Sequence, residues 1–212
     1  MGYGLATTVP PAQEPVTLAA VKAHLNVGHD EDDALITGLI AAAREQTEAE
    51  TGRRWMPQTL TISFGAFPWR CGIGVYADPL GGWPNAAPVI LLPLDPVSAV
   101  NAVRYYDAAG ALKTLTAGAD YLTWLSHSPP VVYPAPVRQW PETQAGRLSV
   151  VEVEFVAGYP DASAVPAAAK AAMLLAVGQW YEHRGDSEEA SEMGLPSAAL
   201  RLLRTLHTGH YS

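Results

Sequence analysis

Apolar positions follow a helical period near both ends of the chain and a period of two in the middle. From Leu35 to Ala43, apolar side chains recur at three- and four-residue spacing, which makes one stripe on a helix. Residues 59–64 alternate polar and apolar side chains instead, which is typical of a half-buried strand. The change of period predicts an α+β protein whose helices come from both chain ends.

Start and stop signals place the predicted helices. Thr17 is a suitable N-cap, and Gly52 has the position of the residue that ends a helix. Pro166 and Pro196 stand where helix-starting prolines belong. The predicted helices cover about residues 18–25, 32–51, 166–184 and the stretch that begins at Pro196.

Short apolar runs bounded by turn residues predict the strands. A Gly/Pro/Trp-rich stretch over residues 65–88 and a Pro-rich stretch over residues 128–141 interrupt them and are interpreted as loops. The predicted strands are residues 59–64, 89–94, 97–106, 112–115, 120–125 and 148–155.

These elements predict one domain over residues 1–212. Its core is a helical bundle that comes from both chain ends, about residues 17–51 and 165–208, with a β-rich insertion at about residues 56–160. The predicted parts of the domain are an extended arm (1–16), a helical core (17–55 and 165–195), the β-rich insertion (56–160) and a C-terminal docking segment (196–212).

Charge limits the classes of partner. The chain has 13 Lys and Arg against 21 Asp and Glu, which gives a formal net charge of −8. A protein that binds DNA without sequence preference needs a basic face to release counterions, so this class is disfavoured. The sequence contains no apolar run near the roughly 20 residues that a membrane-spanning helix needs, so we expect no membrane contact.

Candidate chemistry is sparse. Cys71 is the only cysteine, and His207 and His210 lie near the chain end without an acidic neighbour. The acidic stretch around Glu188 lacks the Asp/Gly spacing of a calcium loop. We therefore expect no catalytic residue, no metal and no cofactor.

Two other functions would require features that the sequence can be searched for. A small hydrolase would need a nucleophile, a base and an orienting acid, and no Gly-x-Ser-x-Gly elbow is present. A carbohydrate-binding or tail-associated β-module is suggested by four tryptophans, and glycan binding by the isolated protein would favour it. These are Trp69, Trp83, Trp124 and Trp140.

Several short motifs occur in a characteristic order. The chain opens with Val16-Thr-Leu-Ala-Ala-Val-Lys-Ala-His-Leu25, and the second helix has an Asp-rich start and a Thr51-Gly-Arg end. Strands flank Pro93, and Phe155-Val-Ala-Gly-Tyr159 and Gln179-Trp-Tyr-Glu-His-Arg184 follow. In this order and spacing the chain resembles the head–tail connector (adaptor) proteins of long-tailed phages and of phage-derived gene transfer agents.

The resemblance implies a structural virion protein without enzymatic activity. It implies a ring of about a dozen copies, located at the head–tail junction and assembled in the cytoplasm of the bacterial host. The ring would bind the portal protein on one side and the next connector, a stopper or the tail on the other. DNA would pass through the ring without specific binding.

Three sets of residues are candidates for contacts in such a ring. The C-terminal helix either packs on its own domain or docks on the portal. The acidic loop is either a solvated outer loop or a lining of the DNA channel, where like charge repels DNA. The apolar faces of helix 166–184 exceed what one core needs and suggest a subunit interface. The sets are Leu200, Arg201, Leu203, Arg204 and Leu206 for the portal; Asp186, Glu188, Glu189 and Glu192 for the channel; and Met173, Val177 and Trp180 for the interface.

Overall fold

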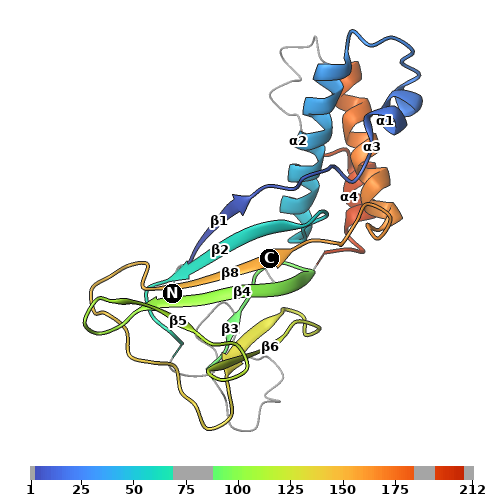
Figure 1. The fold of residues 1–212 in the computed structure, drawn as a ribbon. Coiled ribbons are helices and arrows are strands. Elements are labelled where there is room, and N and C mark those ends of the chain that lie inside the picture. The colour runs from blue at the N-terminus through green and yellow to red at the C-terminus, as the bar shows by residue number, and fades with distance from the viewer. Residues whose placement is uncertain (1–2, 69–87, 184–193, 208–212) are drawn as a thin grey trace. The chain divides into compact units, whose positions relative to one another are not determined.

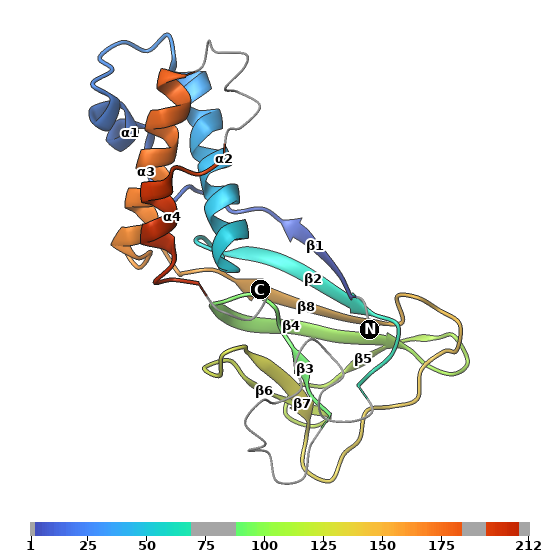
Figure 2. The same cartoon turned by 180° about the vertical axis from the view of Figure 1, so that it is seen from behind.

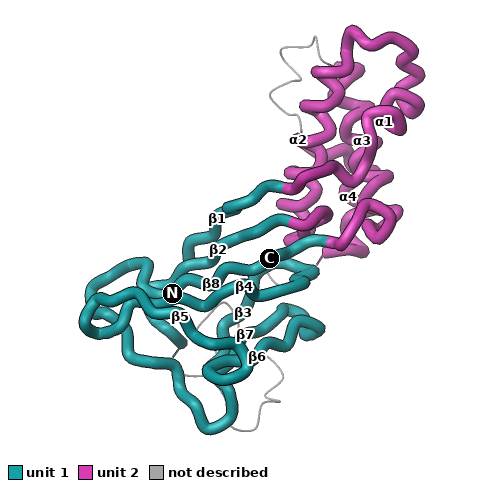
Figure 3. The backbone as a smooth tube through the Cα atoms, in the orientation of Figure 1, with its two compact units in different colours: residues 1–10, 58–158 teal, residues 11–57, 159–212 magenta. Residues whose placement is uncertain are grey.

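The computed structural model describes residues 3–68, 88–183 and 194–207. It divides the chain into two compact units, which Figure 3 shows in different colours. Unit 1 contains residues 1–10 and 58–158, and unit 2 contains residues 11–57 and 159–212. The chain is thus α+β, as predicted, with the described strands in unit 1 and the described helices in unit 2.

Unit 2 draws its helices from both ends of the chain. They are α1 (Leu18–Leu25), α2 (Asp33–Thr51), α3 (Ala167–Glu182) and α4 (Ser197–Leu203). The hydroxyl of Thr17 accepts a hydrogen bond from the Ala20 N–H at 3.2 Å, which caps α1 as expected. Gly52 ends α2 in the left-handed conformation, with φ at 67°, a position that suits glycine.

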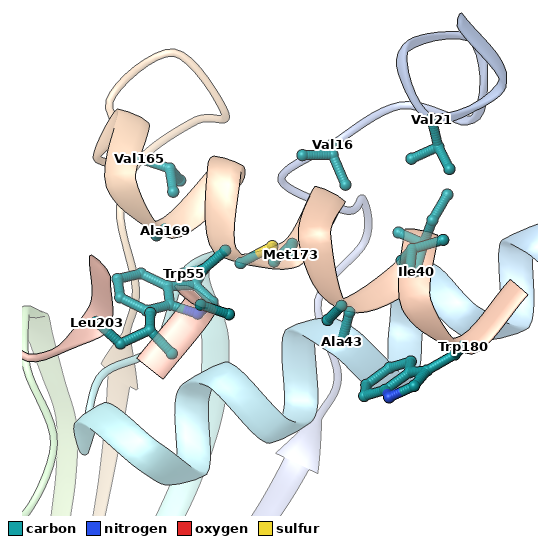
Figure 4. Packing of buried hydrophobic residues seen from close by; sticks show 14 of the residues in the cluster. Val16, Val21, Ile40, Ala43, Trp55, Val165, Ala169, Met173, Trp180 and Leu203 are labelled. Atoms are coloured by element: carbon teal, nitrogen blue, oxygen red, sulfur yellow. The ribbon is translucent and has the colours of Figure 1, made fainter. Parts of the chain in front are cut away.

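The core of unit 2 joins residues that are far apart in the sequence. Val21 from α1, Ile40 from α2 and Met173 from α3 are buried in one apolar cluster. Figure 4 shows this cluster, in which Leu203 of α4 lies beside Trp55. The segments at both chain ends therefore stabilise each other by burying the same apolar surface.

Unit 1 contains two antiparallel sheets (Figures 1 and 2). The five-stranded sheet has the order β1-β2-β8-β4-β5, and the three-stranded sheet has the order β3-β7-β6. The bounds are β1 (Tyr3–Val9), β2 (Gln58–Phe64), β3 (Ile90–Leu91), β4 (Val97–Tyr106), β5 (Leu112–Leu115), β6 (Tyr121–Trp124), β7 (Val131–Pro134) and β8 (Val151–Ala157).

The register of β2 and β8 explains the core of unit 1. Leu60 pairs with Phe155 and Ile62 pairs with Val153, and all four side chains are buried. The residues between them, such as Glu154, are half-buried on the other face. The period of two seen in the sequence therefore separates a core face from a polar face.

The structure differs from the predicted strands in three places. The predicted arm contains β1, an edge strand paired with β2, and all seven of its residues are exposed. The Pro-rich stretch contains β7, which pairs with both β3 and β6. The predicted strand over residues 89–94 is shortened to Ile90–Leu91. Most of the predicted loop at 65–88 lies outside the described residues.

Candidate functional site

The predicted Thr51-Gly-Arg end of α2 leads into a segment that contacts the C-terminus of α4. The Nε–H of Arg53 donates a hydrogen bond to the Leu206 carbonyl at 2.6 Å. An Nη1–H of the same guanidinium donates to the Tyr159 hydroxyl at 3.4 Å. One half-buried arginine thus connects three segments of unit 2 that are distant in sequence.

Trp55 anchors this arginine segment. Its side chain is fully buried, and its indole Nε1–H donates to Thr47 Oγ1 at 2.9 Å. Its ring is stacked with that of Tyr159, with centroids 6.2 Å apart and planes 16° apart. The tyrosine that accepts from Arg53 is therefore held in place by a buried aromatic neighbour.

A buried charge network supports the same end of α2. Arg44 pairs with Glu14 at 2.9 Å, with Glu48 at 3.1 Å and with Glu45 at 3.2 Å. Burial alone would lower the pKa of Arg44, but the surrounding carboxylates, Glu48 foremost, outweigh it and raise the pKa. Arg44 is therefore a fixed positive charge that holds the segment around Glu14 against α2.

Arg54 lies in a different electrostatic environment. Its Nε is 3.8 Å from Glu48, and burial lowers its pKa, an effect that the Glu48 charge opposes and the Arg44 charge reinforces. Two adjacent arginines after α2 thus have separate tasks. Arg53 contacts the C-terminal segment, whereas Arg54 belongs to the charge network.

Ionic contacts also fix the other end of α2. The Lys22 ammonium lies 2.6 Å from Asp30 and 2.7 Å from Asp33, and these hydrogen bonds raise its pKa. The Tyr181 hydroxyl of α3 donates a hydrogen bond to Asp32. The acidic start of α2, predicted as a favourable helix-start charge, therefore also joins α1 and α3 to α2.

The five residues predicted to contact the portal occupy different environments. Leu203 is 1% exposed in the core of unit 2, and Leu206 is half-buried against that core. Leu200 is half-buried outside the core cluster, and Arg201 and Arg204 are exposed. The helix thus packs on its own unit and leaves one face, which we call the α4 outer face: Leu200, Arg201 and Arg204.

The three residues predicted to form a subunit interface lie in the core of their own unit. Met173 and Val177 are fully buried, and Trp180 is 3% exposed. α1, α2 and α4 all pack on α3 and cover these side chains within the unit. These side chains therefore need no neighbouring subunit to be removed from water.

The predicted channel residues Asp186, Glu188, Glu189 and Glu192 lie outside the described residues. Within the described ranges, no group of three or more His, Cys, Asp or Glu side chains could hold a metal ion. No helix in the described part of the chain is long and apolar enough to cross a membrane.

The tryptophans do not form a common surface in the described part of the chain. Trp140 is stacked on Phe67 at 4.7 Å, and its Nε1–H donates to the Pro88 carbonyl at 2.7 Å. Trp124 is exposed on β6, and Trp69 and Trp83 lie outside the described residues. Because Trp140 has a packing role, the tryptophan argument for a carbohydrate-binding module is weakened.

Part of the chain matches a known protein family. Residues 15–108 match the family model of the phage gp6-like head-tail connector protein. Comparison with curated proteins gave no significant match.

Solved structures share the fold over almost the whole chain. A chain of the neck of an empty gene transfer agent (GTA) particle, computed with C6 symmetry, superposes with a TM-score of 0.71 at 23% identity, covering 98% of this chain and 95% of that chain. A chain of the virion of a native GTA particle gives 0.69 at 23% identity, covering 96% and 94%. A chain of the neck of a native GTA particle, computed with C12 symmetry, gives 0.68 at 24% identity, covering 98% and 95%.

The family match includes α1, α2 and the strands β2, β3 and β4. It therefore contains the Arg53 segment and, apart from Glu14, the charge network. The resemblance of this chain to the phage head–tail connector proteins is thus confirmed by the family model over residues 15–108, and nearly the whole chain shares its fold with chains of GTA particles.

Proposed function

We propose that this chain is a structural virion protein, a head–tail connector located in the neck between the portal and the tail. The match of residues 15–108 to the connector family carries the proposal, and the fold shared with chains of GTA particles supports it. The chain would be assembled in the host cytoplasm and would continue the channel through which DNA leaves the head.

The proposed assembly is a closed ring of about twelve identical subunits. The C6 and C12 symmetries of the GTA necks that share the fold support cyclic symmetry. In such a ring each subunit uses two different surfaces, because head-to-tail contacts are heterologous. Since Met173, Val177 and Trp180 are buried within the subunit, we propose that they support the ring by holding α3 in place.

The proposed portal contact is made by the C-terminal segment. Residues 194–212 carry two arginines and no acidic side chain, in a chain with a net charge of −8. This local excess of positive charge favours an acidic protein surface as the partner, because complementary charge aids encounter and specificity. The next connector or the tail would bind elsewhere on the ring.

The acidic side chains Asp186, Glu188, Glu189 and Glu192 are proposed to face the channel on sequence grounds. Like charge on a channel wall repels DNA and keeps it from binding. Replacing all four by Lys should permit assembly but slow genome ejection. A particle structure with this loop on the outer rim of the ring would contradict the assignment.

The function is tested by removing the protein from its particle. Without a connector, assembly should yield filled heads that lack tails, visible by negative-stain electron microscopy. Supplying the wild-type chain during assembly should restore tailed particles. Normal tailed particles in the absence of the chain would contradict the proposal.

A further inference from the structure

We infer that Arg53 holds α4 on its own unit, so that the C-terminal segment binds its partner through the α4 outer face without leaving the core. This inference rests on the proposed function for the identity of the partner. The sequence left open whether the C-terminal helix packs on its own domain or docks on the portal, and in this arrangement α4 does both.

The first observation is burial. Ala199 and Leu203 are at most 1% exposed in the core of unit 2, while Leu195, Leu202 and Leu206 pack against that core. Moving α4 onto a partner would expose these side chains and the surface of α3 that they cover. Such a move has a free-energy cost that a docked helix avoids.

The second observation is the hydrogen bonding at the end of α4. The chain carries no acidic side chain after residue 192 that could bind this helix to the unit by charge. Arg53 instead donates to the Leu206 carbonyl at 2.6 Å, in the turn that follows α4. Hydrogen bonds from charged donors are stronger than neutral ones.

The third observation is that Arg53 is itself positioned. Tyr159 accepts from its guanidinium, and the Tyr159 ring is stacked with buried Trp55. A lysine at this position would replace two N–H groups held in a fixed planar fork by donors on a single flexible nitrogen, which suits two separate acceptors less well. The planar fork of arginine therefore matches this task.

The accessible part of α4 includes two arginines and one leucine. Arg201 and Arg204 are exposed, and neither takes part in an ion pair with another described residue. Leu200 lies next to them outside the core cluster. Arg201 also donates a hydrogen bond to the Ser197 carbonyl of its own helix at 3.4 Å. A surface with one apolar side chain and two exposed arginines fits an acidic protein surface.

The test combines hydrogen exchange with binding to the purified portal ring of the same particle. In Arg53→Ala, the amides of residues 197–206 should exchange about tenfold faster, because a charge-assisted hydrogen bond is lost. The dissociation constant for the portal ring should rise by about tenfold, because the helix must then be ordered on binding. Arg53→Lys should retain part of the protection from exchange and part of the affinity for the portal ring.

Two further variants separate positioning from contact. Tyr159→Phe keeps the aromatic stack but removes the acceptor, so it should shift both readouts in the same direction as Arg53→Ala and by less. The triple variant L200E/R201E/R204E should weaken portal binding by about a hundredfold and leave the exchange rates unchanged. Arg138→Glu, at an exposed arginine in unit 1, makes one such charge reversal away from α4 and should change neither readout.

Unchanged exchange in Arg53→Ala would overturn the inference, as would an unchanged dissociation constant. Binding of the triple variant at wild-type strength would overturn the role of the α4 outer face. If that variant instead loses binding to duplex DNA and keeps portal binding, the partner is a nucleic acid and the inference is overturned. Failure of the wild-type chain to bind any portal ring would contradict the proposed function, while the exchange experiment would still test the Arg53 contact.

Discussion

Glu48 accepts a hydrogen bond from the backbone N–H of Trp55 at 2.9 Å, which ties the last turns of α2 to the segment that follows it. The same carboxylate pairs with Arg44 at 3.1 Å, and its residue is only 3% exposed. Glu48 therefore links the buried charge network to the tryptophan that supports Tyr159 and, through it, Arg53.

Removing this carboxylate should destabilise unit 2. We expect Glu48→Ala to lower the free energy of unfolding by about 3 kcal/mol, because it leaves Arg44 buried with fewer partners. Glu48→Gln should cost less, because an amide oxygen can still accept from Trp55. Urea unfolding checks both values. Glu50→Ala, at an exposed position of the same helix, is the control, and its free energy of unfolding should stay within about 0.5 kcal/mol of the wild-type value. A similarly small effect of Glu48→Ala would contradict the account.

Phe155 should dominate the stability of unit 1. It lies on β8 between Leu60 of β2 and Val100 of β4, and its side chain is fully buried in the core, so Phe155→Ala should cost about 3–5 kcal/mol. The neighbouring Val156 faces the other side of the sheet and is half-buried, so Val156→Ala should cost less than about 1 kcal/mol. Equal losses in the two variants would mean that the strand register is wrong.

The Arg104–Glu154 pair should make stability depend on acid pH. Hydrogen bonds from Arg104 and Asn101 lower the pKa of Glu154 below its ordinary value of 4.5. A lowered folded-state pKa contributes stability above pH 4.5, and this contribution is lost as the pH falls through the lowered value. Unfolding measured between neutral pH and acid should show this loss, and Arg104→Met should reduce it. An unchanged acid dependence in the variant would refute the link.

Two neighbouring leucines of α4 should behave differently, because they differ in burial. Leu203→Ala should cost about 2–4 kcal/mol in stability, because its side chain is 1% exposed in the core. Leu200→Ala should cost less than about 1 kcal/mol, because its side chain lies outside the core cluster. Deleting residues 196–212 should therefore destabilise unit 2 as well as remove the proposed contact, and a deletion with unchanged melting would contradict the packing.

Local signals in the sequence account for much of this fold. Thr17 and Gly52 mark helix ends that the structure reproduces, because caps depend on the few residues around them. The alternation over residues 59–64 predicts β2, because one face of that strand is buried. Elements whose evidence lies within a short window could thus be predicted.

Elements that depend on distant partners could not be predicted in the same way. Residues 3–9 have no clear period and form a strand because they pair with β2. Arg53 and Leu206 are 153 positions apart in the sequence, so no local sequence pattern predicts their contact. Trp180 is buried because the other helices of unit 2 pack on α3. Its apolar side chain alone does not show whether it lies in the core of its own unit or in a subunit interface.

A reconstruction of the neck of the assembled particle by electron cryomicroscopy tests the central claim most directly. The account predicts a closed ring of this chain, of about twelve copies, between the portal and the tail, with α4 still packed on unit 2 and Arg201 and Arg204 facing the portal. A neck without this chain, or with a single copy of it, would contradict the account.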